Sequence, residues 1–139
     1  MVRNRRRPYN SSMIYEHDNT AGFLKATLEM KAKQNARYSM RAFAKKIGLS
    51  PGGLSQVMNG KKHLSAERAH SIGQALELDA REAEYFLSLV QMESTRAPAL
   101  KLQYLEKVKH LNPMVTLGED MKQTLLTLEI RDFDQLDAV

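Results

Sequence analysis

The chain has 139 residues, 42 % of them hydrophobic, with a formal net charge of +5 and no cysteine. This length favours one folded domain with an appendage, and the lack of cysteine excludes disulfides, thiolate zinc sites and cysteine nucleophiles. No apolar run approaches the roughly 20 residues of a membrane-spanning helix, and no apolar stretch of a secretory signal follows the basic N-terminus. We therefore expect a cytoplasmic protein without a membrane partner.

The charges are unevenly distributed along the chain. Residues 1–66 carry 13 Lys and Arg against 3 Asp and Glu, whereas residues 67–139 carry 8 against 13. From Lys31 to Ala66 there are eight basic residues and no acidic one. This distribution suggests that the first half of the chain faces a polyanion. The alternative is two ordinary surfaces of opposite sign, which would not account for the motif described below.

Residues 1–19 are predicted to form a flexible basic arm. Four arginines precede Pro8 in this segment: Arg3, Arg5, Arg6 and Arg7. An arm of this kind could lie in a DNA minor groove or along the phosphate backbone. The alternative is a solvated tail.

Helical periodicity begins after the arm. A first helix is predicted to start after Asn19 or Thr20, and a second to run from about residue 39 to residue 47. In the first helix the apolar residues fall on one face of a 3.6-residue period. The residues of this face are Phe23, Leu24, Leu28 and Ala32.

The third predicted helix, residues 51–59, has signals at both ends. Ser50 suits the N-cap, and Pro51 suits the first helical position. Gly60 suits the left-handed turn that ends many helices.

Two further helices are predicted to complete the domain, over residues 20–94 in all. Ser65 can cap the fourth helix, and Asp79-Ala-Arg-Glu82 is a capping box for the fifth. The residues expected to be buried in these two helices are Ala69, Ile72, Leu76, Phe86, Leu89 and Val90.

Residues 95–139 are predicted to be a C-terminal helical extension. A sixth helix carries Leu102, Leu105 and Val108 on its apolar face and stops at Asn112-Pro113. A second capping box, Thr116-Leu-Gly-Glu119, precedes another amphipathic stretch with Met121, Leu125 and Leu128. No segment has a convincing strand pattern, so the predicted fold class is all-α.

Residues 41–60 have the spacing of a helix-turn-helix. Two helices that cross steeply through a short turn need a small side chain at the crossing, where Ala44 stands, and a glycine in the turn, where Gly48 stands. The second helix must bury an apolar pair three residues apart, which Leu54 and Val57 provide. Each match alone is weak, but the joint spacing is fairly specific.

The segment from about Thr20 to Leu78 resembles the phage-repressor (Cro/C1, or xenobiotic-response-element) helix-turn-helix family. The resemblance rests on Phe43-Ala44, Gly48-Leu49-Ser50, Leu54-Ser55, Asn59-Gly60 and Ile72-Gly-Gln-Ala-Leu76. It implies a lambda-repressor-like five-helix domain followed by the helical extension. Arg41-Ala-Phe-Ala and Glu84-Tyr-Phe86 are also similar to a group of larger bacterial proteins in which a separate C-terminal module follows such a domain.

The resemblance makes residues 51–59 the recognition helix. Its base-reading positions would be Pro51, Gly52, Gly53 and Gln56, of which only Gln56 has a side chain that can read a base edge, with adenine as its typical partner. In one interpretation the missing side chains let backbone N–H groups approach a phosphate. In the other the domain no longer reads sequence.

The predicted ligand is double-stranded DNA, held largely through its phosphates. Lys61 and Lys62 follow the recognition helix, and Arg37 and Arg41 flank the start of the helix before it. The expected DNA-contacting residues are therefore Arg37, Arg41, Ser50, Pro51, Gly52, Gly53, Ser55, Gln56, Asn59, Lys61 and Lys62.

The most favoured function is a DNA-binding transcriptional regulator, which would form a homodimer through residues 97–139. In the alternative, the residues of this extension pack on their own domain. The competing function is a protein-interaction module that keeps the fold without reading sequence and binds a second protein. We expect no metal site, because the His63, Glu67 and His70 spacing matches no recognised metal motif. We also expect no cofactor, and no enzyme activity, because no serine, histidine and acidic group suggests nucleophilic catalysis.

Overall fold

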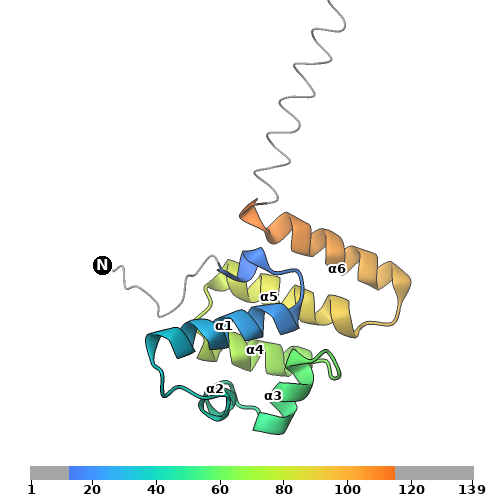
Figure 1. Ribbon diagram of the computed structural model, residues 1–139. Helices are drawn as coiled ribbons and strands as arrows, with labels where there is room; N and C mark the ends of the chain where they lie inside the picture. Colours follow the sequence, from blue (N-terminus) through green and yellow to red (C-terminus); the bar gives the residue numbers. More distant parts are fainter. Residues whose placement is uncertain (1–12, 115–139) are drawn as a thin grey trace, which may run out of the picture.

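The computed structural model describes residues 13–114. Within this range the chain forms one 3-10 turn and six α-helices, and none of these residues is in a β-strand, which confirms the all-α prediction (Figure 1). The elements are η1 (Met13–Glu16), α1 (Thr20–Gln34), α2 (Met40–Ile47), α3 (Pro51–Met58), α4 (Ala66–Ala75), α5 (Ala80–Ser94) and α6 (Pro98–Leu111).

Side-chain caps fix where the first five helices begin. The Ser50 hydroxyl accepts the Gly53 N–H at 2.9 Å at the start of α3, and the Ser65 hydroxyl caps α4 in the same way. In α5 the Asp79 carboxylate accepts the Glu82 N–H, and the Glu82 carboxylate accepts the Asp79 N–H, both at 2.8 Å. These bonds satisfy N–H groups that have no partner inside the helix. The predicted caps are confirmed at all three helices.

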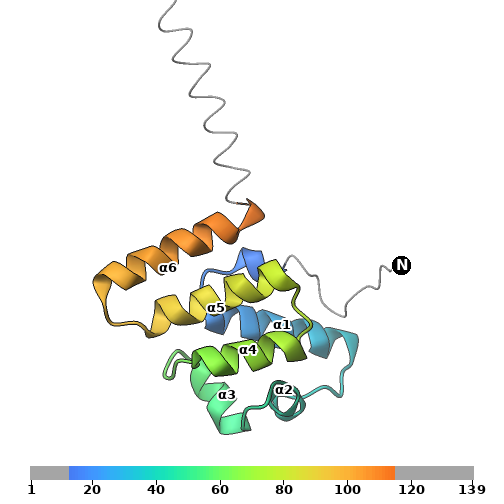
Figure 2. The same cartoon turned by 180° about the vertical axis from the view of Figure 1, so that it is seen from behind.

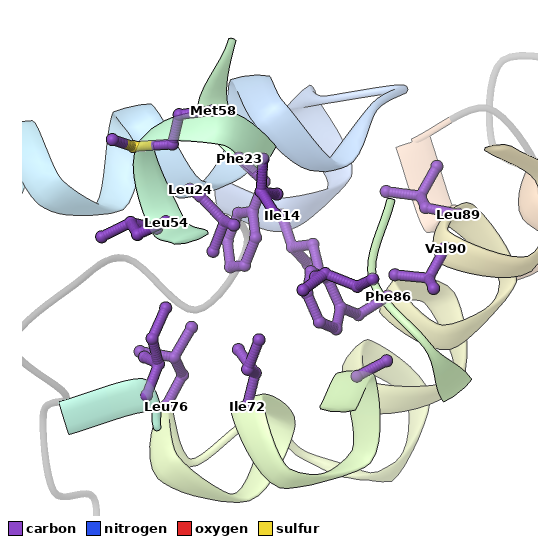
Figure 3. Packing of buried hydrophobic residues seen from close by; sticks show 14 of the residues in the cluster. Ile14, Phe23, Leu24, Leu54, Met58, Ile72, Leu76, Phe86, Leu89 and Val90 are labelled. Carbon is purple, nitrogen blue, oxygen red and sulfur yellow. The ribbon is translucent and has the colours of Figure 1, made fainter. Parts of the chain in front are cut away.

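The core lies where α1, α3, α4 and α5 meet (Figure 3). The rings of Phe23 and Phe86 contact edge to face, with their centroids 5.6 Å apart. Every residue predicted to be buried in α4 and α5 is buried, as are the residues expected to join α2 and α3. The predicted residues that are buried are Ala44, Leu54, Val57, Ala69, Ile72, Leu76, Phe86, Leu89 and Val90, and Phe43 and Ile47 of α2 are buried as well.

The buried face of α1 differs from the predicted one. Leu28 and Ala32 are only half-buried, whereas Thr27 and Lys31 are buried. Thr27 reaches the interior because its hydroxyl donates to the Phe23 carbonyl at 2.8 Å, which satisfies its polar atom inside the helix. Burial together with the neighbouring Lys46 lowers the pKa of the Lys31 ammonium, which lies 5.7 Å from the Tyr38 ring centroid.

The segment before α1 packs on the domain. Met13 and Ile14 are 6 % and 1 % exposed, and the Tyr85 hydroxyl donates to the His17 carbonyl at 2.7 Å. Residues 13–19, which the sequence analysis assigned to the arm, therefore belong to the folded domain. The four arginines of the predicted arm lie outside the described residues, so the arm stays a prediction for residues 1–12.

Helix α6 packs along α5, on the side away from α2 and α3 (Figures 1 and 2). The Arg81 guanidinium donates to the Leu111 carbonyl at 2.6 Å. Val108 is buried, but Leu102, which was predicted on the same apolar face, is 63 % exposed. The helix ends at Asn112 as predicted. The second capping box and the stretch after it lie outside the described residues.

Candidate nucleic-acid interface

The turn between α2 and α3 is a tight helix-turn-helix connection. Gly48 ends α2 with φ of 81°, a left-handed conformation in which glycine avoids the strain of a Cβ. The N–H groups of Gly48 and Leu49 donate to the carbonyls of Lys45 and Ala44, at 3.3 and 2.9 Å. These bonds close the last turn of α2 and direct the chain into α3.

Arg68, in the first turn of α4, also holds this turn. Its guanidinium Nη1 donates to the Gly48 carbonyl at 2.7 Å, across 20 residues of sequence. The bond ties the start of α4 to the turn that orients α3. This role could not be predicted from the sequence, because local spacing does not show which carbonyl a distant arginine reaches.

Helix α3 has one buried and one exposed face. Leu54, Val57 and Met58 are buried. The base-reading residues implied by the resemblance lie on the other side. Gln56, Pro51, Gly52 and Asn59 are exposed, and Gly53 and Ser55 are half-buried.

The two adjacent glycines of α3 have different surroundings. A Cβ added to Gly53 would lie 3.0 Å from the Ser50 hydroxyl oxygen, so the cap at the start of α3 favours glycine there. A Cβ added to Gly52 would meet no heavy atom within 4 Å. The folded chain therefore gives no steric reason for the absence of a side chain at Gly52.

Exposed cations surround the helix-turn-helix. Arg37 precedes α2, Arg41 is in its first turn, and Lys61 and Lys62 follow α3; all four are exposed. Within residues 13–114 none of them pairs with a carboxylate. Because their charges are not neutralised by this part of the chain, they can bind phosphates.

An open hollow of about 310 Å³ lies beside α3, between this helix, the loop after it and the start of α4. Apolar side chains, among them Val57 and Leu64, contribute to its lining. The cationic side chains of Lys62 and Arg68 line it as well. The hollow is therefore an amphipathic surface next to the exposed face of α3.

Two other kinds of site are absent from the described residues. No group of three or more His, Asp or Glu residues between residues 13 and 114 is arranged to hold a metal ion. In the same range no helix is both long and apolar enough to cross a membrane. His63 lines the hollow beside α3 and does not share a metal-binding cluster with Glu67 and His70.

Comparison with known proteins identifies the domain. Residues 30–82 match the family model described as Helix-turn-helix, a segment that runs from the second half of α1 to the first turn of α5. Searches of curated proteins and of solved structures gave no significant match. Domains of the matched family are DNA-binding regulatory domains rather than catalytic ones, which supports a DNA-binding regulator. Residues 30–82 of this chain are therefore a helix-turn-helix domain of the Cro/C1 type.

Proposed function

We propose that this protein is a DNA-binding transcriptional regulator in which α3 enters the major groove and the surrounding cations hold phosphates. The observation that carries the proposal is the exposed face of α3 inside a matched helix-turn-helix domain, next to cations without acidic partners. A recognition helix must present side chains or backbone to base edges while its other face is anchored in the core. The burial pattern of α3 has this form.

The proposed division of contacts follows from which groups α3 exposes. Gln56 reads a base edge, with adenine as its typical bidentate partner. Lys61, Lys62, Arg37 and Arg41 contact phosphates and position the domain without reading sequence. Gly52 supports close approach of the first turn to DNA, because the fold itself leaves room for a side chain at this position.

Dimerisation through residues 97–139 is part of the proposal, since a single domain of this size reads few base pairs and two-fold sites require two copies. Within α6, Leu100 and Leu102 are 42 % and 63 % exposed although the helix packs on α5. These two leucines support a contact between copies. The packing of α6 on α5 supports the alternative, in which the extension completes its own domain.

The proposal is tested by fluorescence-anisotropy titration of the full chain. A duplex selected from a random pool and an unrelated duplex are compared at low and near-physiological salt. We expect Gln56→Ala to lower affinity for the selected duplex by a factor of about 10–100 and to leave the unrelated duplex unaffected. The double variant Lys61→Ala, Lys62→Ala should weaken binding to both and reduce the salt dependence.

A matched charge control is Lys101→Ala, Lys109→Ala, which removes two exposed lysines from α6, on the far side of the domain (Figure 1). If this control weakens binding as much as the Lys61, Lys62 variant while sedimentation shows an unchanged oligomeric state, the assigned interface is wrong. Equal affinity for both duplexes, lost at physiological salt, would favour the second candidate, a protein-interaction module. The bare first turn of α3, with Pro51 and Gly52, is the observation that favours that candidate.

A further inference from the structure

The hollow beside α3 lies within the proposed DNA interface. Ser50, Gly53 and Lys62 line it, and all three are among the predicted DNA-contacting residues. The start of α4 contributes Ser65 and Arg68. A group bound in the hollow would therefore cover part of the surface that the proposed function assigns to DNA.

The chemistry of the hollow specifies its occupant. Leu49, Val57 and Leu64 supply apolar surface, and Lys62 and Arg68 supply positive charge. The nearest acidic residue in sequence is Glu67, which follows a stretch of 37 residues without one. A matching ligand has one or two apolar side chains flanked by carboxylates.

Residues 129–139 of this chain have that composition. The segment is Glu-Ile-Arg-Asp-Phe-Asp-Gln-Leu-Asp-Ala-Val, with four acidic residues and one basic residue. Phe133 lies between two aspartates, and Leu136 precedes a third. Its charge and its alternation of acidic and apolar residues are complementary to the hollow.

The intervening chain is long enough to bring this segment to the hollow. Met114 comes three residues after the end of α6, and α6 lies on the opposite side of the domain from α3 (Figures 1 and 2). Residues 115–128 are 14 residues and span up to about 45 Å when extended. A folded domain of about 100 residues has a radius of gyration of only about 13 Å. Such a domain is about 34 Å across, so the segment reaches the far side only when residues 115–128 are extended, because the helix that Thr116-Leu-Gly-Glu119 predicts would span only about 21 Å.

We propose that residues 129–139 dock in the hollow beside α3 of the same chain and compete there with DNA, which leaves residues 97–128 for the contact between copies. The docking is independent of DNA, and only the competition rests on the proposed function. A linker of 14 residues that spans the distance gives an effective concentration of the order of millimolar. A segment with a dissociation constant near 0.1–1 mM would then be bound most of the time and would weaken DNA binding about two- to tenfold.

The docking is tested first without DNA, by comparing amide NMR spectra of the full chain and its Phe133→Ser, Leu136→Ser variant. This variant leaves the net charge unchanged. We expect its shift changes to include the amides of Gly53, Lys62 and Arg68, and to be the same at two protein concentrations. Unchanged shifts at these amides overturn the docking, whether or not the protein binds DNA. A concentration-dependent difference overturns it as well, because the segment would then come from a second copy.

The competition is tested by anisotropy titration with a DNA duplex at low salt. The same apolar variant should bind two- to tenfold more tightly than the unaltered chain. A second variant, Asp132→Asn, Asp134→Asn, Asp137→Asn, is compared with Glu106→Gln, Glu119→Gln, Asp120→Asn, which changes the net charge by the same amount. We expect the first triple variant to gain more affinity than the second. Equal gains would mean that net charge alone acts, and would overturn the competition.

Discussion

Replacing Gly52 by alanine tests whether this glycine is needed for DNA binding or is neutral. The added methyl group meets no heavy atom of the protein within 4 Å. Alanine is favoured over glycine in a helix by about 0.5–1 kcal/mol, and by less in the first turn. We expect Gly52→Ala to stabilise the fold by about 0.4 kcal/mol. For a domain of this size that raises the melting temperature by about 2–3 °C.

The same substitution should weaken DNA binding if the first turn of α3 lies against DNA. The methyl group would then hold the backbone away from its contacts, and we expect about tenfold lower affinity, or about 1.4 kcal/mol. Thermal unfolding followed by circular dichroism gives the stability, and anisotropy titration at fixed salt gives the affinity. The two effects have opposite signs, so loss of affinity cannot be a consequence of loss of fold.

Gly53→Ala is the matched control. Its Cβ would lie 3.0 Å from the Ser50 hydroxyl oxygen, which accepts the Gly53 N–H. We expect it to lower stability by up to about 1 kcal/mol, the usual contribution of an N-cap. If Gly52→Ala stabilises the fold and leaves affinity unchanged, the backbone-approach model is wrong. If Gly52→Ala lowers the melting temperature, the added methyl group contacts other atoms of the protein, contrary to the open space around Gly52.

Three further predictions concern the support of the interface and its flanks. Arg68→Ala removes the donor to the Gly48 carbonyl, and we expect it to lower the free energy of unfolding in urea titration by about 1 kcal/mol and also to lower DNA affinity. If neither the stability nor the affinity changes, Arg68 does not hold the turn. Burial, with Asp79 and Glu82 nearby, raises the pKa of Tyr15 to about 12. The stability that the neutral hydroxyl contributes is therefore present below pH 10 and lost as pH rises through 12, so the melting temperature should fall more steeply above pH 10 in the unaltered chain than in Tyr15→Phe. Val108→Ala should destabilise the domain by about 1–2 kcal/mol through lost burial, whereas Leu102→Ser, at a site 63 % exposed, should leave the melting temperature unchanged. If sedimentation shows that Leu102→Ser leaves the dimer intact, this leucine is not part of the contact between copies.

The helices and most of the core were predictable because their signals are local. Ser50, Ser65 and the Asp79–Glu82 pair mark helix starts within four residues, and apolar spacing in α4 and α5 marks the face that is buried. The face of α1 was predicted less well, because Thr27 and Lys31 are buried through contacts that hydrophobic spacing does not reveal. Thr27 satisfies its hydroxyl within the helix, and Lys31 lies near an aromatic ring.

Contacts between distant segments were not predictable in this way. The Asn112 amide donates to the Tyr15 carbonyl at 2.8 Å, across 97 residues, and so joins the end of α6 to the segment before α1. The sequence marks Asn112 only as a helix stop, and no pattern points to Tyr15. The candidate site likewise has some features that local sequence predicts and others that depend on the folded structure. The sequence predicted the exposed face of α3, but the difference between Gly52 and Gly53 depends on the position of one hydroxyl oxygen.

The proposed DNA contacts and the proposed docking of residues 129–139 share Lys62 and both depend on positive charge, which gives a last prediction. With Gln56 as the main base-reading side chain, affinity comes mostly from phosphate contacts, and four cations give a salt slope of about −3 to −4 per domain. The acidic residues of segment 129–139 meet part of the same positive surface, so salt screens this attraction as well. The affinity gained by the Asp132, Asp134, Asp137 variant should therefore shrink as salt rises from 50 to about 300 mM. A gain that is constant over this range would show that the segment acts through something other than charge.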